Sequence, residues 1–143
     1  MDSRVVLITG AAGHVGFRVV QYAPEYGFAV KAVVRRQAKA GTLEMAIVPN
    51  FTVPHAVDAV VQGANYIIHY ASPIPFAAPP TSDDPENDFI RPAVNATLGI
   101  FQSAARTPSV KRIFVTSSCI AVAPVAAALV DTGEMYTAEL STT

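Results

Sequence analysis

This sequence of 143 residues contains one cysteine and no tryptophan, and its net charge is close to zero. The one cysteine, Cys119, cannot form a disulfide within the chain, which excludes a disulfide-stapled fold and leads us to expect a cytoplasmic location. A net charge of −1 gives no electrostatic reason to expect nucleic acid as a partner. We expect neither a secretory leader nor a membrane span, because no apolar run approaches the roughly twenty residues that a transmembrane helix needs.

Apolar residues, by contrast, are abundant and make up 51% of the chain. A chain of this length forms one domain of ordinary size and buries roughly two-thirds of the surface that its unfolded form exposes. We therefore expect a hydrophobic core that needs no disulfide or metal to support it, and a small molecule as the partner.

The beginning of the chain combines an apolar run with regularly spaced glycines. Residues 5–9 (VVLIT) form a continuous, largely β-branched run, which is typical of a strand buried on both faces of a parallel sheet. The following Gly-x-x-Gly-x-x-Gly spacing lets the backbone turn sharply and approach a pyrophosphate, with the free N–H groups of the next helix directed at the phosphates. We interpret this segment as a nucleotide-binding turn rather than an ordinary strand-to-helix connection. Its candidate cofactor-binding residues are Gly10, Ala12, Gly13, His14, Val15 and Gly16.

Two arginines, Arg35 and Arg36, follow the second predicted strand. In dinucleotide-binding folds the residue at this point meets the adenosine ribose: an acidic residue binds the free 2′-hydroxyl, whereas arginine accommodates a 2′-phosphate. No Asp or Glu lies between Glu25 and Glu44, so the sequence favours NADP(H) over NAD(H). The alternative is that the two arginines form only a solvated rim at the end of the strand.

Strand and helix patterns alternate along the chain. Strands are predicted at residues 5–9, 28–34, 43–48, 65–70 and 110–116, and helices at residues 14–22, 54–61 and 87–105. This alternation predicts an α/β fold, a Rossmann-like doubly wound parallel sheet of about five strands in the order 3-2-1-4-5. We assign residues 1–118 to an NADP-binding domain and residues 119–143 to an atypical, alanine-rich tail packed on the same domain.

Two further features are expected at the carboxyl edge of this sheet. His69 ends the fourth predicted strand, where open α/β folds bind ligands, but a lone histidine there is more often a packed structural residue than an acid or base. The proline-rich loop at residues 72–85 either lines a substrate pocket or is an ordinary surface connection.

Six short segments, taken together, carry a family resemblance. They are residues 9–16 (TGAAGHVG), 34–35 (VR), 69–73 (HYASP), 84–87 (DPEN), 109–112 (SVKR) and 116–118 (TSS). With these segments the chain resembles the N-terminal part of an extended short-chain dehydrogenase/reductase, in the branch of plant dihydroflavonol reductases and fungal NADPH-dependent aldehyde and ketone reductases. The resemblance implies that the glycine turn binds pyrophosphate and that Arg35 selects the 2′-phosphate.

The resemblance also implies roles for residues at other strand ends. Ala71, Ser72 and Pro73 would lie along the ribose and nicotinamide of NADP(H). Ser118 would be the catalytic serine that hydrogen-bonds the substrate carbonyl. Asn50 stands where relatives usually have an aspartate near the adenine.

The chain departs from the family at the catalytic acid. These reductases use a Tyr-x-x-x-Lys pair, in which the lysine and the cofactor lower the pKa of the phenol so that it can exchange a proton near neutrality. Here Tyr136 follows Ser118 sooner than the family's tyrosine does, Leu140 instead of a lysine stands four residues after Tyr136, and Lys111 is the last lysine. Tyr136 is therefore a candidate displaced acid only, and we expect a chain truncated before the pair, without the C-terminal substrate domain.

Three functions remain open at this point. The chain is a reductase-like protein that binds NADP(H) and reduces a carbonyl weakly or with a partner chain, or an isomerase, cyclase or lyase that uses the former cofactor cleft, or a non-catalytic binding module. In the family, later chain covers the long helix, so we expect a homodimer or larger homo-oligomer that buries Phe101 and its apolar neighbours.

Overall fold

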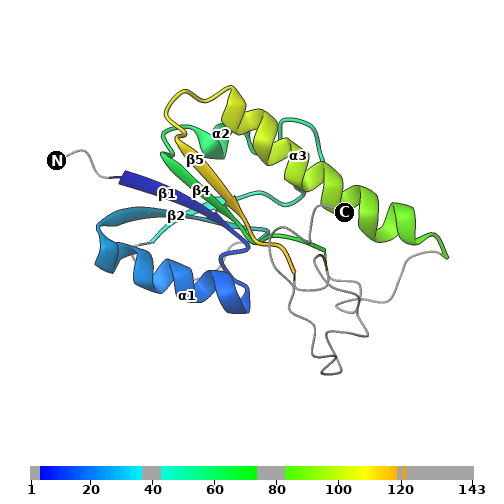
Figure 1. Ribbon diagram of the computed structural model, residues 1–143, viewed down its shortest axis with the longest axis horizontal. Helices are drawn as coiled ribbons and strands as arrows, with labels where there is room; N and C mark the ends of the chain where they lie inside the picture. Colours follow the sequence, from blue (N-terminus) through cyan, green and yellow to red (C-terminus); the bar gives the residue numbers. More distant parts are fainter. Residues whose placement is uncertain (1–3, 37–42, 74–82, 119–120, 122–143) are drawn as a thin grey trace, which may run out of the picture.

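Five parallel strands form the centre of the described structure. The computed structural model describes residues 4–36, 43–73, 83–118 and 121. Within these residues the strands are β1 (Arg4–Thr9), β2 (Phe28–Val34), β3 (Glu44–Ile47), β4 (Tyr66–His69) and β5 (Arg112–Val115). They form one sheet in the order β3-β2-β1-β4-β5, which confirms the predicted Rossmann-like fold and strand order (Figure 1).

Helices cover both faces of this sheet (Figure 1). On one face lies α1 (His14–Tyr22), which continues into the 3₁₀ turn η1 (Ala23–Tyr26), and on the other lie α2 (Asp58–Val61) and α3 (Arg91–Ala105). Neighbouring side chains of β1 enter two different cores. Leu7 packs with residues of α2 and α3, and Ile8 packs with Val20 of α1. Because both faces of β1 are covered, its residues 5–8 are continuously apolar.

Proline and a left-handed residue account for the largest differences from the predicted boundaries. The predicted helix at 54–61 is wrong over its first half, because the chain there forms turns and His55 has a φ of 65° before α2 begins. The predicted helix at 87–105 is divided into a π-helical segment, η2 (Glu86–Ile90), and α3. Pro92 has no N–H to donate to the preceding turn, and the Arg91 N–H bonds to the carbonyl five residues earlier.

Two predicted features fall mainly outside the described residues. The tail at 119–143 lies outside them apart from residue 121. The proline-rich loop at 72–85 is described only at residues 72–73 and 83–85. The packing of the tail and the role of the loop therefore stay predictions.

Apolar side chains remain exposed on α3 and β5. Val94, Leu98 and Phe101 follow one another along one side of α3 and are 48%, 49% and 45% exposed. Phe114 and Val115 of β5 are exposed to a similar degree. The expectation of uncovered apolar surface on the long helix and the fifth strand is confirmed. None of the described helices is both long and apolar enough to cross a membrane.

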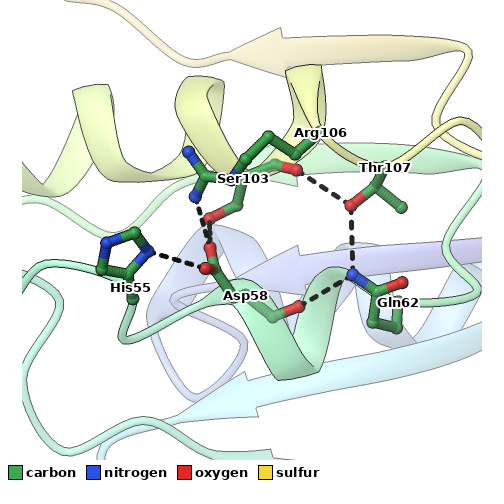
Figure 2. A network of polar contacts seen from close by, with 6 residues as sticks. All are labelled: His55, Asp58, Gln62, Ser103, Arg106 and Thr107. Atoms are coloured by element: carbon green, nitrogen blue, oxygen red, sulfur yellow. Dashed lines mark hydrogen bonds and ion pairs between the residues drawn. The ribbon is translucent and has the colours of Figure 1, made fainter.

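A polar network ties α2 to the carboxyl end of α3 (Figure 2). The Asp58 carboxylate accepts hydrogen bonds from the Ser103 hydroxyl, from Nδ1 of His55 at 2.8 Å and from the Arg106 guanidinium at 2.7 Å. These hydrogen bonds, led by that of Ser103, lower the pKa of Asp58 from 3.8 to about 2. The charged carboxylate is thus the form that joins the two helices.

Replacing Asp58 with asparagine is expected to lower the urea midpoint of unfolding at pH 7, because the three donors lose their charged acceptor. The folded pKa lies below the unfolded one, so the wild-type carboxylate stabilises fully above pH 3.8, and this contribution is lost as the pH falls toward about 2. The difference in midpoint between wild type and D58N should close over that interval. Glu25→Gln, which removes an exposed carboxylate of η1, is the control with little effect at any pH. A difference between wild type and D58N that stayed constant down to pH 2 would contradict this account.

Candidate functional site

A cavity of about 670 Å³ opens at the carboxyl edge of the sheet. In open α/β sheets ligands bind at this edge, at the point where neighbouring connections leave in opposite directions, which here lies between β1 and β4. The volume falls within the roughly 300–1,000 Å³ that small-molecule and cofactor sites occupy. The lining consists of Gly10, Ala12, Gly13, His14, Val15, Gly16, Val33, Val34, Arg35, Pro49, Asn50, Phe51, Thr52, Tyr70, Ala71, Ser72, Pro73, Pro92, Ala96 and Thr116.

Every predicted cofactor-binding residue except Arg36 belongs to this lining. The structure therefore brings three segments that are distant in sequence into one site: the glycine turn after β1, Arg35 after β2, and residues 71–73 after β4. Arg36 is exposed and lies outside the described lining, so its predicted contact gains no support from the geometry.

The glycine turn is built from close backbone contacts. Gly10 has a φ of 66°, a conformation that side-chain-bearing residues rarely adopt, and its carbonyl accepts the Gly13 N–H at 2.9 Å. A Cβ at Gly16 would lie 2.3 Å from that same carbonyl oxygen. No other residue fits at Gly16 without moving the turn, so the first turn of α1 lies directly against the end of β1.

The amino end of α1 has the electrostatic character of an anion site. Gly13 caps the helix without a side-chain hydrogen bond, and the first turn contains no acidic residue. The first N–H that bonds within the helix is that of Phe17, to the Gly13 carbonyl at 2.9 Å. The preceding N–H groups, those of residues 14–16, carry the partial positive charge of the helix terminus at the cavity lining.

Arg35 and Asn50 bring polar groups to the cavity from the ends of β2 and β3. Arg35 is exposed and forms no ion pair with an acidic residue in the described part of the chain. The side-chain oxygen of Asn50 accepts the backbone N–H of Thr52 at 2.9 Å and its hydroxyl at 2.8 Å. Asn50 therefore offers a ligand its NH₂ donors, whereas an aspartate at this position would offer only acceptors.

Neither predicted catalytic residue is found on the described lining of the cavity. Ser118 is exposed and does not contribute to the lining, whereas Thr116, two residues earlier, does. Tyr136 and Leu140 lie outside the described residues. The catalytic roles of Ser118 and Tyr136 therefore stay predictions.

Several lining residues were not recognised in the sequence. Five of them lie within five residues after the end of β3, β4 or β5, and that position is the signal that could have found them, because ligands bind at carboxyl strand ends. Two belong to α3, and only the packing of this helix over the sheet brings them to the cavity. The residues concerned are Pro49, Phe51, Thr52, Tyr70, Pro92, Ala96 and Thr116.

The network around Asp58 contains the residue types of a catalytic triad but not its arrangement (Figure 2). His55 and Ser103 both bond to the Asp58 carboxylate, with no hydrogen bond between histidine and serine. A serine nucleophile needs the histidine as its base, so this cluster does not activate Ser103. The described residues also contain no group of three or more His, Cys, Asp or Glu side chains that could hold a metal ion.

Gly16→Ala is expected to displace the glycine turn, because the added Cβ would lie 2.3 Å from the Gly10 carbonyl oxygen. We expect a lower thermal midpoint and changed amide ¹H–¹⁵N shifts at Gly10 and Ala71 across the cavity. Gly99→Ala is the matched control within α3, since its Cβ would make only an ordinary 3.8 Å contact with Phe51. Equal thermal midpoints for the two variants would show that the turn is not confined as described.

Comparisons with known proteins agree on one family. Residues 6–140 match the sequence model of the NAD-dependent epimerase/dehydratase family. Ketoreductase CTB6 from Cercospora nicotianae is 36% identical over 137 residues, which cover 84% of this chain and 38% of that protein. Aldehyde reductase 2 from Sporidiobolus salmonicolor is 32% identical over 131 residues, which cover 83% of this chain and 36% of that protein.

A solved structure shows the same fold. The crystal structure of yeast methylglyoxal/isovaleraldehyde reductase Gre2 complexed with NADPH has a TM-score of 0.74 and 30% sequence identity, covering 85% of this chain and 39% of that chain. The chain thus spans less than two fifths of the length of these relatives. Since the family match extends over nearly the whole sequence and the fold agrees, the chain belongs to the NAD-dependent epimerase/dehydratase family, the extended short-chain dehydrogenases/reductases.

Proposed function

We propose that the cavity binds NADP(H) and that this chain is the cofactor-binding part of a cytoplasmic, NADPH-dependent carbonyl reductase. The observation that carries the proposal is the presence, in one cavity, of the uncapped amino end of α1 and of Arg35. The names of the relatives, a ketoreductase and an aldehyde reductase, support this substrate class, and the Gre2 structure with NADPH supports this cofactor.

The glycine turn would hold the pyrophosphate. Gly10 and Gly16 present no side chain, so phosphate oxygens can approach the backbone, and the N–H groups of residues 14–16 would donate to them. A negative charge at a helix amino end is stabilised by about 0.3–1 kcal/mol, and by up to about 2 kcal/mol in partly buried sites. This interaction would fix the middle of the dinucleotide without distinguishing NADP(H) from NAD(H).

The distinction between the two cofactors would fall to Arg35. Its guanidinium can bond a 2′-phosphate with two N–H groups, and a hydrogen bond to a charged group contributes about 1.5–3 kcal/mol. The NH₂ of Asn50, on the neighbouring strand end, would donate to an acceptor nitrogen of the adenine ring. The adenosine half would therefore lie over the ends of β2 and β3.

The nicotinamide half would lie beside residues 71–73 at the end of β4. Bound NADPH supplies a hydride to the carbonyl carbon, and the carbonyl oxygen must then receive a proton. In this sequence the Ser118 hydroxyl is the candidate donor of a hydrogen bond to that oxygen, and Tyr136 is the candidate source of the proton. Because Leu140, four residues after Tyr136, replaces the lysine that a Tyr-x-x-x-Lys pair requires, we expect this chain to bind NADPH with little turnover of its own.

Titration with NADPH and NADH tests the cofactor assignment. Wild type should bind NADPH at least about tenfold more tightly than NADH, because the 2′-phosphate adds a charged hydrogen bond to Arg35. Arg35→Ala should weaken NADPH binding by a similar factor, leave NADH binding unchanged and so remove the preference.

Arg36→Ala provides the matched control, since Arg36 neighbours Arg35 but does not line the cavity. It should retain the preference for NADPH. Equal affinity of wild type for the two cofactors, or an equal loss of NADPH affinity in R35A and R36A, would refute the role of Arg35.

We also propose that the apolar stripe of α3, formed by Val94, Leu98 and Phe101, mediates self-association. Sedimentation velocity at micromolar concentration should show a dimer or larger assembly for wild type, and Phe101→Lys should shift it toward monomer. Gln102→Lys adds the same charge at the next residue of the helix and should leave the assembly intact. A monodisperse wild-type monomer would eliminate this proposal.

A further inference from the structure

A buried hydrogen-bonded pair, Thr9 and His69, lies at the facing ends of β1 and β4. The two residues are opposite each other in the sheet and are 0% and 2% exposed. The Thr9 hydroxyl oxygen lies 2.7 Å from Nδ1 of His69. Neither residue belongs to the cavity lining, but the chain that continues from His69 forms one wall of the cavity with residues 70–73.

Counting donors and acceptors assigns the proton in this pair. The Thr9 oxygen also lies 3.1 Å from the backbone nitrogens of both Tyr70 and Ala71. A backbone N–H can only donate, so these two bonds use both lone pairs of the hydroxyl oxygen. The hydroxyl hydrogen is then donated to Nδ1 of His69, which must be unprotonated. His69 is therefore a neutral imidazole with its hydrogen on Nε2.

The two N–H groups that Thr9 binds belong to the wall facing the glycine turn. A Cβ at Gly10 would lie 3.0 Å from the nitrogen of Ala71 and 3.2 Å from Cβ of Tyr70, so the turn and the wall are already in close contact. The next strand is joined here as well, because the Thr116 N–H donates to the His69 carbonyl at 3.2 Å. The Thr9 hydroxyl thus bonds the first two residues of this wall to the end of β1, directly before the glycine turn.

We propose that His69 is a positioning residue for cofactor binding, which acts through Thr9. By accepting the hydroxyl hydrogen of Thr9, Nδ1 of His69 leaves both lone pairs of that oxygen to Tyr70 and Ala71, and so holds the wall at residues 70–73 against the glycine turn. This inference rests on the proposed function, since it names the residue that holds one wall of the NADP(H) cavity in position for binding.

A direct acid or base role for His69 does not fit the same geometry. Nδ1 is occupied by Thr9, and Nε2 is buried with no hydrogen-bond partner among the described residues. Burial lowers the pKa of His69, which favours the uncharged ring. An aliphatic side chain would fill this space without an unsatisfied N–H. What the histidine adds is its Nδ1 acceptor.

The proton assignment can be measured independently of any ligand. In protein labelled with ¹⁵N-histidine, the nitrogen shifts and ring couplings distinguish the two neutral tautomers from the charged ring. We expect the Nε2–H tautomer for His69 at pH 7. A proton on Nδ1 would overturn the hydrogen-bond assignment, because the Thr9 oxygen would then face three donors.

Two substitutions of His69 separate positioning from packing. In His69→Asn the side-chain oxygen can replace Nδ1 as the acceptor for the Thr9 hydroxyl, whereas His69→Leu removes the acceptor. We expect H69L to accelerate hydrogen exchange of the Tyr70 and Ala71 amides and to weaken NADPH binding by about tenfold or more. H69N should keep both properties within about threefold of wild type.

Ile67→Val is the control for stability alone. Ile67 is fully buried two residues earlier on the same strand, packs in the apolar core with Leu7, and has no side-chain group that could join the hydrogen bonds of Thr9, so this variant should lower the thermal midpoint without changing NADPH affinity. Wild-type NADPH affinity in H69L, or an equal loss in I67V and H69L, would overturn the proposal. If wild type itself binds no NADPH, the proposed function fails, and amide exchange in H69L against H69N still decides whether the pair holds the wall.

Discussion

At the end of β1, three backbone segments meet with no side chain between them. A Cβ at Gly16 would lie 2.3 Å from the Gly10 carbonyl oxygen, and one at Gly10 would lie 3.0 Å from the nitrogen of Ala71. This contact brings the first turn of α1 and the end of β4 to the same point of the sheet edge. The uncapped N–H groups of α1 consequently face a cavity whose opposite wall is held by the Thr9 hydroxyl.

The candidate binding site and the polar network that joins α2 to α3 lie in different parts of the molecule. At the carboxyl edge, Arg35 forms no ion pair with a described acidic residue and the amino end of α1 has no side-chain cap, so both suit an anionic ligand. In the network around Asp58 the Ser103 hydroxyl, His55 and Arg106 all donate to one carboxylate, and Ser103 and Arg106 join the end of α3 to α2 (Figure 2). An arginine thus lines a candidate binding site in one place and joins two helices in the other. Only the geometry around each arginine distinguishes the two roles.

Sequence patterns predicted the fold and much of the lining of the cavity at the carboxyl edge, because strand–helix alternation and glycine spacing are local features. They did not predict helix boundaries or lining residues that depend on a single hydrogen bond or on a single tertiary contact. The missing N–H of Pro92 produced a π-helical segment, and the left-handed His55 shortened α2. Phe51 and Ala96 line the cavity only because of tertiary packing. The link between Thr9 and His69 required the strand register, which places the two residues opposite each other.

The most direct test of the central claim is the titration of NADPH into uniformly ¹⁵N-labelled protein, followed by amide shifts. If the cavity at the carboxyl edge is the cofactor site, the amides of Gly10, Gly13, Gly16 and Ala71 shift together with one dissociation constant, while that of Asp58, in the other network, does not move. The absence of shifts at the glycine turn, or shifts confined to other surfaces, would contradict the assignment of this cavity to NADP(H).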